Sequence, residues 1–507
     1  MTRNGSTPEH FDVLIVGAGL SGIGAAAHLQ DRLPRKSFAL LEAREASGGT
    51  WDLFRYPGIR SDSDMHTLGY RFRPWTAAKA IADGPSILDY IRDTARERGI
   101  DRHIRYRHKV ERAEWSSADA CWTVRARRLD TDETVELTCH FLFICGGYYD
   151  YAQPYLPEFA GVERFKGEFF HAQHWPDDLD YTGKRVVVIG SGATAMTIVP
   201  ALAEKAEHVT MLQRSPTYVI SLPSEDPIAN FLRRHLSERR AYAITRWKNV
   251  LLQSVTYRLS RRRPELVKGL IRRGLERELP PDYDIDTHFK PRYNPWDQRL
   301  CLVPDADLFK VLRNGRASIA TDHVGTFTER GITLQSGEEL EADIIVAATG
   351  LNLLALGGVE LAVDGSDVEI PRTMAYKAIM LGGVPNMAFT VGYTNASWTL
   401  KADLTSEYVC RLLRYMDVHG YRQAVPELDD PDVHEEPFLD FSAGYVQRAL
   451  HKFPKQGSKT PWRLRQNYAR DIKMLRHDPI DDGTIVFSNP GWTAASDTAD
   501  AVSLPAA

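Results

Sequence analysis

Two glycine-rich turns contain the residues with the clearest chemical role. The first contains Gly17, Gly19 and Gly22. In such a turn the first glycine permits a sharp bend, the second lets a pyrophosphate approach the backbone, and the third lets the next helix lie close to the strand. The N-terminus of that helix offers N–H donors to phosphates. Glu42 follows 20 residues after Gly22, where a carboxylate can hold ribose hydroxyls. We therefore predict a dinucleotide site here, with a purely structural glycine turn as the alternative.

The second turn has Gly190 and Gly192, with Ala195 at the third position. The strand that follows it ends in Gln213 and Arg214 instead of an acid. A carboxylate there would repel a 2′-phosphate, whereas a guanidinium can bind one through several N–H donors. This turn predicts an NADP site in which Arg214 selects the phosphorylated cofactor. The alternative is a surface arginine at a strand end.

Each turn must be positioned by a strand, a helix and a second strand. Buried strands are expected at residues 11–16 and 185–189, and second strands that end at Glu42 and Arg214, with helical stretches between them. This repeated unit is typical of a parallel, doubly wound sheet. The predicted fold class is therefore α/β, with two Rossmann-like dinucleotide-binding domains.

Two dinucleotide sites on one chain favour electron transfer between two cofactors, most simply from NADPH to FAD. None of the five cysteines forms a CxxC pair, which excludes a dithiol reductase and favours oxygen chemistry or a simple dehydrogenase. The cysteines also form no short Cys/His cluster, so we expect no metal site.

The overall charge and the N-terminal residues limit the possible partners and location. The 63 Lys and Arg residues against 67 Asp and Glu residues give a net charge of −4, which argues against a nucleic-acid binder. The first ten residues lack the apolar run of a signal peptide, and glycines interrupt the longest apolar stretch, residues 13–29. We expect a soluble, cytoplasmic protein in a reducing compartment.

A basic segment interrupts the α/β pattern. Residues 231–280 contain 14 Lys and Arg against 4 Asp and Glu, in helical spacing, and predict a helical insertion. Its cations form either a solvated face or a contact with an anionic membrane surface, at the inner face of the cell membrane. The apolar residues among them fit an interfacial helix, a substrate cavity or the core; they are Trp247, Val250, Leu251, Leu252 and Tyr257.

The segment between the two turns carries a longer motif. It follows the pattern FxGxxxHxxxWP, set by Phe165, Gly167, His171, Trp175 and Pro176. This pattern resembles the fingerprint of type I Baeyer–Villiger monooxygenases, whereas the related flavin-containing monooxygenases usually have Tyr or Phe in place of Trp175. The resemblance implies that the motif couples cofactor binding to domain movement. His171 is therefore not expected to donate a proton, and simple packing of a linker is the alternative.

Other stretches extend the resemblance from residue 11 to about residue 489; they are residues 48–51, 55–58, 60–65, 294–299 and 392–398. The resemblance implies that Arg299 is the active-site arginine and that Asp62 orients it and touches the nicotinamide. A fixed guanidinium can stabilise an anionic oxygen nucleophile and the adduct that it forms with a ketone. A salt bridge at a domain junction is the alternative for Arg299. Many members of the family have Lys where this chain has Gln298, which leaves more of the 2′-phosphate binding to Arg214.

The turns and the resemblance together give the expected cofactor-binding residues. They are Gly17, Gly19, Ser21, Gly22, Glu42, Gly49, Thr50, Trp51, Arg60, Ser61, Asp62, Val110, Gly190, Ser191, Gly192, Ala193, Thr194, Ala195, Gln213 and Arg214. The expected domains are an FAD-binding domain in two parts (1–150 and 351–507, the latter with a C-terminal tail), an NADP-binding domain in two parts (151–220 and 299–350) and the insertion (221–298).

The resemblance implies an FAD- and NADPH-dependent enzyme that inserts one oxygen atom of O2 into ketones and oxygenates sulfides or thioamides. Two alternatives remain at this point. One is a flavin-containing monooxygenase restricted to heteroatoms, and the other is a non-catalytic dinucleotide sensor whose insertion binds a partner or a membrane.

Overall fold

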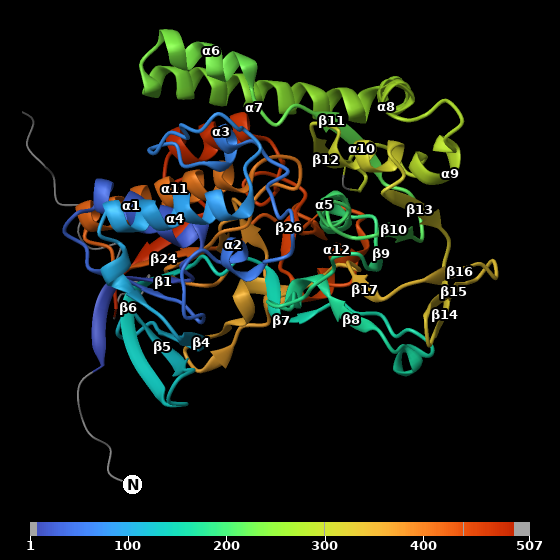
Figure 1. Cartoon of the computed structure of the whole chain (residues 1–507). Coiled ribbons are helices and arrows are strands. Elements are labelled where there is room, and N and C mark those ends of the chain that lie inside the picture. The colour runs from blue at the N-terminus through green and yellow to red at the C-terminus, as the bar shows by residue number, and fades with distance from the viewer. Residues whose placement is uncertain (1–7, 299, 440, 491–507) are drawn as a thin grey trace, which may run out of the picture.

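A computed structural model of the chain describes residues 8–298, 300–439 and 441–490 (Figure 1). The larger of its two main sheets has nine strands. In sheet order they are β20 (Ser366–Asp367), β19 (Glu360–Val363), β4 (His108–Ser116), β5 (Cys121–Arg128), β6 (Thr134–Ile144), β1 (Glu9–Val16), β2 (Phe38–Leu41) and β3 (Ile104–Arg105), and β23 (Met387–Phe389) pairs with β6.

The first glycine turn joins β1, which lies between β6 and β2, to α1 (Leu20–Arg32). Successive side chains of a strand point to opposite faces. Accordingly Val13 and Ile15 belong to the hydrophobic core on one face, and Leu14 and Val16 belong to the core on the other. Strand β1 is parallel to both β2 and β6, as a doubly wound sheet requires.

The second sheet is built around the second glycine turn, and all of its strands are parallel. In sheet order they are β13 (Ala317–Thr321), β10 (His208–Gln213), β9 (Arg185–Ile189), β17 (Ile344–Ala347) and β8 (Glu168–His171). Helix α5 (Ala193–Leu202) follows β9 directly after the turn. The two sheets and their helices confirm the predicted α/β class with two Rossmann-like units.

Smaller elements connect and cover the sheets. One small sheet has three strands: β14 (Val324–Thr328), β15 (Gly331–Leu334) and β16 (Glu339–Glu341). The other small sheets are strand pairs: β7 (Tyr149–Pro154) with β18 (Leu351–Leu353), β11 (Tyr218–Leu222) with β12 (Leu300–Pro304), β21 (Ala375–Tyr376) with β22 (Met380–Leu381), β24 (Gln423–Pro426) with β27 (Ile485–Ser488), and β25 (Glu435–Pro437) with β26 (Lys455–Gly457). The helices outside the insertion include α2 (Thr50–Leu53), α3 (Met65–Leu68), α4 (Gly84–Glu97), α10 (Asp307–Arg313), α11 (Trp398–His419), α12 (Gly444–Gln447) and α13 (Tyr468–Ile472).

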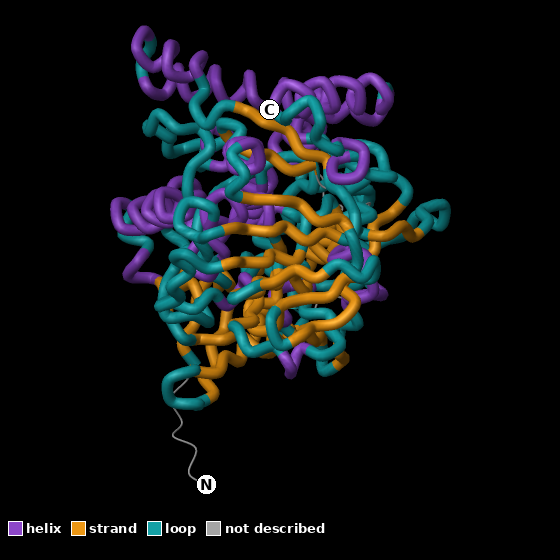
Figure 2. The backbone as a smooth tube through the Cα atoms, turned by 45° about the vertical axis from the view of Figure 1, so that its right-hand side comes forward, coloured by secondary structure: helices purple, strands orange, loops and turns teal. Residues whose placement is uncertain are grey.

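The predicted helical insertion is present between β11 and β12. Its helices are α6 (Pro227–His235), α7 (Glu238–Arg262), α8 (Pro264–Glu278) and α9 (Ile285–Phe289). Helices α6, α7 and α8 form a layer above the strands of both sheets (Figures 1 and 2). Helix α7 packs against α3, and α8 packs against β11, so the insertion contacts both dinucleotide-binding units.

A buried cation fixes α7 to the unit that contains the first glycine turn. Arg246 is 5% exposed, and its Nη1 donates to the carbonyl oxygens of His66 and Gly69, each at 2.8 Å. Its Nη2 lies 3.4 Å from Oδ2 of Asp403 on α11. A buried charge that is paired and hydrogen-bonded in this way holds its neighbours in one arrangement.

In the described part of the chain, no helix is long and apolar enough to cross a membrane.

Candidate active site

A cavity of about 1330 Å³ runs along both glycine turns. Its volume exceeds the range of about 300–1,000 Å³ typical of a site for one small ligand. Most of the predicted cofactor-binding residues line it; they are Gly17, Gly19, Ser21, Glu42, Gly49, Thr50, Trp51, Arg60, Ser61, Asp62, Val110, Gly190, Ser191, Gly192, Ala193, Thr194 and Arg214. The structure therefore brings together residues that lie up to 197 positions apart, from Gly17 to Arg214.

The first glycine turn is tightly packed against its neighbours. Gly17 has a φ of +99°, and a Cβ atom added there would lie 2.9 Å from the carbonyl oxygen of Cys145. A Cβ atom at Gly22 would lie 1.9 Å from the carbonyl oxygen of Gly17, so Gly22 acts by packing and does not itself line the cavity. The close approach presents the first N–H groups of α1 to the cavity, as a pyrophosphate requires.

Glu42 is held rigidly at the end of β2. Its side chain is 6% exposed; Oε2 accepts from the N–H of Ala18 at 2.7 Å, and Oε1 accepts from the N–H of Arg44 at 2.9 Å. Burial raises the pKa of Glu42 in spite of these two bonds. Because a carboxylate oxygen accepts more than one hydrogen bond, both oxygens can still accept from ribose hydroxyls.

The wall beyond Glu42 comes from the loops after β2. Thr50 Oγ1 lies 3.1 Å from the hydroxyl of Tyr151, which fixes the start of α2 against β7. Arg60 pairs with Asp307 on α10, so its charge is already compensated inside the protein. Asp62 is exposed and lines the cavity between these groups.

The second glycine turn is more open than the first. Gly190 has a φ of +146° and approaches Ala348, whereas a Cβ atom at Gly192 would meet no atom within 4 Å. Ala195 is fully buried beneath the turn and acts by packing. Arg214 is exposed and lines the cavity, and among the described residues it has no ion-pair partner.

Gln213 does not reach the cavity. It is 1% exposed, and its Nε2 donates to the carbonyl oxygen of His288 and to Oγ1 of Thr321, each at 2.9 Å. The side chain therefore ties β10 to β13 and α9, and of the two residues only Arg214 lines the cavity. The sequence prediction grouped the two residues because both end the strand, but adjacent residues of a strand point to opposite faces.

Arg299, the predicted active-site arginine, lies outside the described residues. Its neighbour Gln298 lines the cavity, as does Leu302 on β12. The strand that carries Leu302 is parallel to β11, which follows β10 of the second sheet. The end of the insertion is thus adjacent to the cavity that Asp62 also lines.

A buried tyrosine in the cavity wall was not predicted from the sequence. The hydroxyl of Tyr393 donates to Oδ2 of Asp471 at 2.7 Å, and Nζ of Lys401 donates to the same oxygen at 2.9 Å. Burial and the neighbouring carboxylate raise the pKa of Tyr393 well above its usual value. Nearby, the indole N–H of Trp398 donates to Oγ of Ser21 at 2.7 Å. Both aromatic residues belong to the stretch 392–398, which resembles the monooxygenase family. That resemblance was the signal that could have predicted them as part of the site.

The motif between the two turns packs and does not face the cavity. His171 is 7% exposed, and burial lowers its pKa to about 4, so the ring is neutral at pH 7. Its Nδ1 accepts from the N–H of Gln173 at 3.1 Å. The side-chain amide of Gln173 donates to the carbonyl oxygens of Asp150 and Tyr151 on β7, each at 3.0 Å. The motif thus connects the second sheet to the segment that leads from the first.

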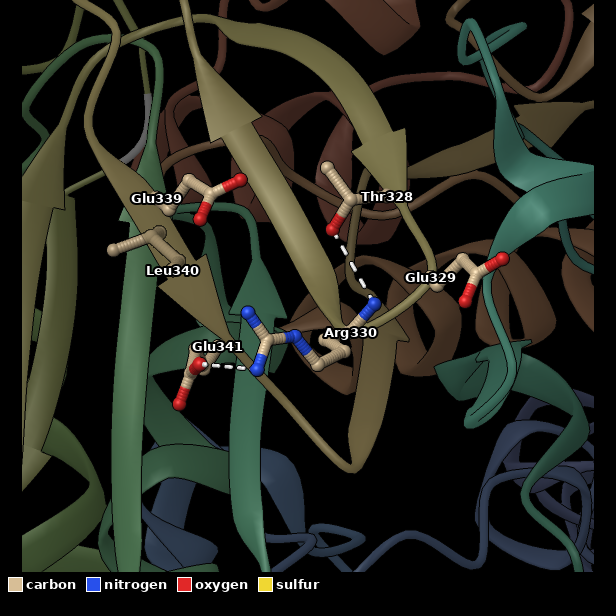
Figure 3. Close-up of a pocket in the computed structure, with 6 residues that line it drawn as sticks. All are labelled: Thr328, Glu329, Arg330, Glu339, Leu340 and Glu341. Atoms are coloured by element: carbon tan, nitrogen blue, oxygen red, sulfur yellow. Dashed lines mark hydrogen bonds and ion pairs between the residues drawn. The ribbon is translucent and has the colours of Figure 1, made fainter.

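A smaller hollow of about 250 Å³ lies at the outer turn of β14, β15 and β16 (Figure 3). Two of its charged side chains pair with each other, since Arg330 Nη1 lies 3.7 Å from Oε1 of Glu341. Glu329 pairs with Lys166 at 2.7 Å. It contains none of the predicted site residues, and the cavity at the glycine turns is the candidate active site.

Comparisons with known proteins agree with this assignment. Residues 15–82 match the model of an NAD(P)-binding Rossmann-like domain, and residues 81–263 match the model described as flavin-binding monooxygenase-like. The chain is 58% identical to the FAD-containing monooxygenase EthA of Mycobacterium tuberculosis, over 95% of this chain and 98% of that protein. It is 54% identical to EthA of Mycolicibacterium smegmatis, over 95% and 97% of the two chains.

A solved structure of an oxidized steroid monooxygenase bound to NADP has a TM-score of 0.69, at 25% identity, over 84% of this chain and 88% of that one. These matches confirm the predicted class of enzyme, a flavin-dependent monooxygenase, and agree with the predicted pair of cofactors, FAD and NADP. They also bear out the resemblance that the motif between the turns indicated. By its identity to curated relatives over nearly their whole length, this chain belongs to the family of FAD-containing, flavin-binding monooxygenases.

Proposed function

We propose that this chain is an FAD- and NADPH-dependent Baeyer–Villiger monooxygenase that inserts one oxygen atom of O2 into ketones to give esters or lactones. The observation that carries the proposal is the cavity shared by the two glycine turns, because it lets two dinucleotides meet. Oxygenation of sulfides or thioamides fits the same site, since a soft sulfur atom and a carbonyl carbon both react with activated oxygen.

The first turn and Glu42 fit FAD. The tight contact between Gly22 and Gly17 brings the backbone to the pyrophosphate, and the buried carboxylate holds the ribose. The second turn and the exposed Arg214 fit NADPH. The chemistry that bound FAD supplies is the transfer of electrons from NADPH to O2.

We assign to Arg299 the stabilisation of negative charge on the reacting oxygens and to Asp62 the orientation of that guanidinium. Arg299→Ala should keep FAD and still consume NADPH, but should lose ester formation by about 100- to 1,000-fold, the usual cost of removing one preorganised charge-stabilising donor. NADPH consumption should then release hydrogen peroxide. Asp62→Ala should show a milder loss, because the cation remains. Ester formation at the parental rate in Arg299→Ala would mean that the residue is a structural ion-pair partner.

A product screen tests the substrate class. The holoenzyme is incubated with NADPH and linear, cyclic or aryl ketones, and separately with a dialkyl sulfide, and products are identified by mass spectrometry. Esters or lactones from plain ketones support the proposal. Sulfoxide without any ester identifies the heteroatom-restricted alternative, and NADPH oxidation that no substrate stimulates identifies the non-catalytic sensor.

The insertion suggests a second role, which we propose on a separate observation. Side chains of α7 at a spacing of three to four residues form an exposed apolar stripe: Ile244 (48% exposed), Trp247 (54%), Leu251 (64%) and Val255 (51%). This stripe lies opposite the buried face of α7 and continues into Arg258. An apolar stripe flanked by cations fits the surface of an anionic membrane. Val250, predicted with this group, is instead buried.

Vesicle co-sedimentation tests this role. The protein should sediment with phosphatidylcholine vesicles that contain phosphatidylglycerol, and salt should weaken the binding. Leu251→Asp (64% exposed) should reduce it, whereas Val418→Asp, at an apolar residue on α11 that is 73% exposed, should not. If the two variants sediment equally, or if the parent protein does not sediment with the vesicles, the stripe is a solvated face and not a membrane contact.

A further inference from the structure

A second guanidinium lies in the cavity beside the second glycine turn. Arg448 follows α12 and lines the cavity, 234 residues after Arg214 in the chain. Its Cζ lies 3.4 Å from the centroid of the Tyr155 ring. Its Nη2 lies 3.7 Å from the position that a Cβ atom of Gly350 would take. Since Gly350 follows β17, which neighbours β9 in the second sheet, Arg448 lies at the end of the sheet where the NADP site is expected.

Within residues 8–298, 300–439 and 441–490, neither arginine has a carboxylate that balances its charge. Among the described residues, no acidic side chain pairs with Arg448 or with Arg214. Both guanidinium groups line the same cavity, and burial together with the charge of Arg214 lowers the pKa of Arg448. Gln298, which lines the same cavity, contributes no charge. Two uncompensated guanidinium groups in one cavity are stabilised when an anion lies between them.

The ring of Tyr155 holds Arg448 in place. Stacking on an aromatic face restricts a guanidinium without using its N–H donors, which stay available to a ligand in the plane of the group. The hydroxyl of Thr349, the residue before Gly350, donates to the carbonyl oxygen of Tyr155 at 2.7 Å. This bond holds the backbone of Tyr155 against the end of β17. The arrangement therefore preorganises the cation toward the cavity.

We propose that Arg448 and Arg214 together bind the adenosine 2′-phosphate of NADPH, and this proposal rests on the NADPH site proposed above. The two planar cations would recognise the 2′-phosphate by binding this dianionic group between them. The pyrophosphate of the same cofactor has its own donors at the N-terminus of α5, so Arg448 supplies specificity for the phosphorylated cofactor and takes no part in the oxygen chemistry.

Calorimetric titration of the FAD-containing protein tests the assignment without measuring turnover. The probes are 2′,5′-ADP and 5′-AMP, which differ only in the 2′-phosphate. Arg448→Ala should weaken binding of 2′,5′-ADP by about 10- to 100-fold, the range for one charge-assisted hydrogen bond, and should leave 5′-AMP nearly unchanged. Arg448→Lys should be intermediate, because it keeps the charge and loses the planar stack.

Lys452→Ala is the matched control, since it removes an exposed cation four residues further along that does not line the cavity. The flavin spectrum and the far-UV circular dichroism report whether each variant folds, and Arg448→Gln replaces Arg448→Ala if the latter does not. Parental affinity for 2′,5′-ADP in Arg448→Ala overturns the proposal, as does equal weakening of both probes. If the parent protein itself binds the two probes equally, the NADPH assignment fails, and the role of Arg448 fails with it.

Discussion

The two glycine turns have the same layout along the chain but differ in how closed they are. At the first turn, a Cβ atom at Gly19 would lie 3.5 Å from Cα of Gly49, and Glu42 is 6% exposed. At the second turn, Gly192 borders open space and Arg214 is exposed. The first arrangement suits a cofactor that stays bound, and the second suits one that enters and leaves during each catalytic cycle.

Packing around the helices explains the difference. Helix α1 lies between the large sheet and α11, and the bond from Trp398 to Ser21 closes its N-terminus. At α5, Thr194 takes the position of Ser21 and lines the cavity, and Ser191 in the turn bonds to Ser215 and Thr217. Differences in exposure at two equivalent turns therefore predict different exchange rates for the two cofactors.

The largest effect is expected at Glu42. Glu42→Arg removes the acceptor of two backbone N–H groups and places a cation in a buried site, so binding of FAD should weaken by at least about a hundredfold. The parent protein should be yellow with one FAD per chain, and the variant should be purified largely colourless. Glu42→Gln, which keeps the shape, should retain more flavin. Full flavin occupancy in a folded Glu42→Arg protein would contradict the assignment of the first turn.

The next largest effect is expected at Arg214. Arg214→Ala should raise KM for NADPH and reduce the preference for NADPH over NADH by about 10- to 100-fold, while FAD stays bound. Steady-state kinetics with both cofactors measure the change. A variant that discriminates as well as the parent would show that the 2′-phosphate is held by other residues.

Two glycine substitutions, one at a packed position of the first turn and one at an open position of the second, separate effects on stability from effects on cofactor binding. Gly22→Ala forces a methyl group against the carbonyl oxygen of Gly17, and overpacking of this kind should cost about 1–3 kcal/mol of stability. Gly192→Ala meets no atom within 4 Å and should change stability by less than about 0.5 kcal/mol, yet it should weaken NADPH binding. Thermal unfolding and NADPH titration distinguish these outcomes. Equal stability losses would show that Gly192 is packed as tightly as Gly22.

The smallest effect is a pH dependence of flavin retention. Burial raises the pKa of Glu42, so in the flavin-free protein this group contributes stability that is present at low pH and is lost as the pH rises through its folded pKa. Binding of FAD favours the opposite, deprotonated state of Glu42, because ribose hydroxyls donate to the charged carboxylate. Acidification should therefore release FAD at a pH above the ordinary pKa of a glutamate, before the chain unfolds. Glu42→Gln should abolish this acid-induced release of FAD. If FAD is released from the parent protein only as the chain unfolds, protonation of Glu42 does not control flavin retention.

The sequence predicted the parts of the site that are local. A glycine turn, its strand and its helix lie within about thirty residues of each other, so their spacing determines their geometry. Strand alternation alone could not have separated Gln213 from Arg214, since Val209 and Met211 share a buried face with Gln213 but Leu212 on the other face is buried as well.

The remaining contacts depend on tertiary structure. Arg448 reaches Tyr155 only because the C-terminal part of the chain folds back onto the second sheet. Arg246 looked like one more cation of a basic surface, but it is buried against α3 and α11. No local pattern distinguishes such residues from exposed arginines with similar neighbours in the sequence.

Isotope labelling tests the central claim most directly. The purified holoenzyme is supplied with NADPH, a cyclic ketone and ¹⁸O2, and the product and the remaining NADPH are quantified together. We expect a lactone that carries one ¹⁸O atom, formed with one NADPH consumed per product, and almost none with Arg299→Ala. Consumption of NADPH without labelled lactone from any ketone in the screen would contradict the account.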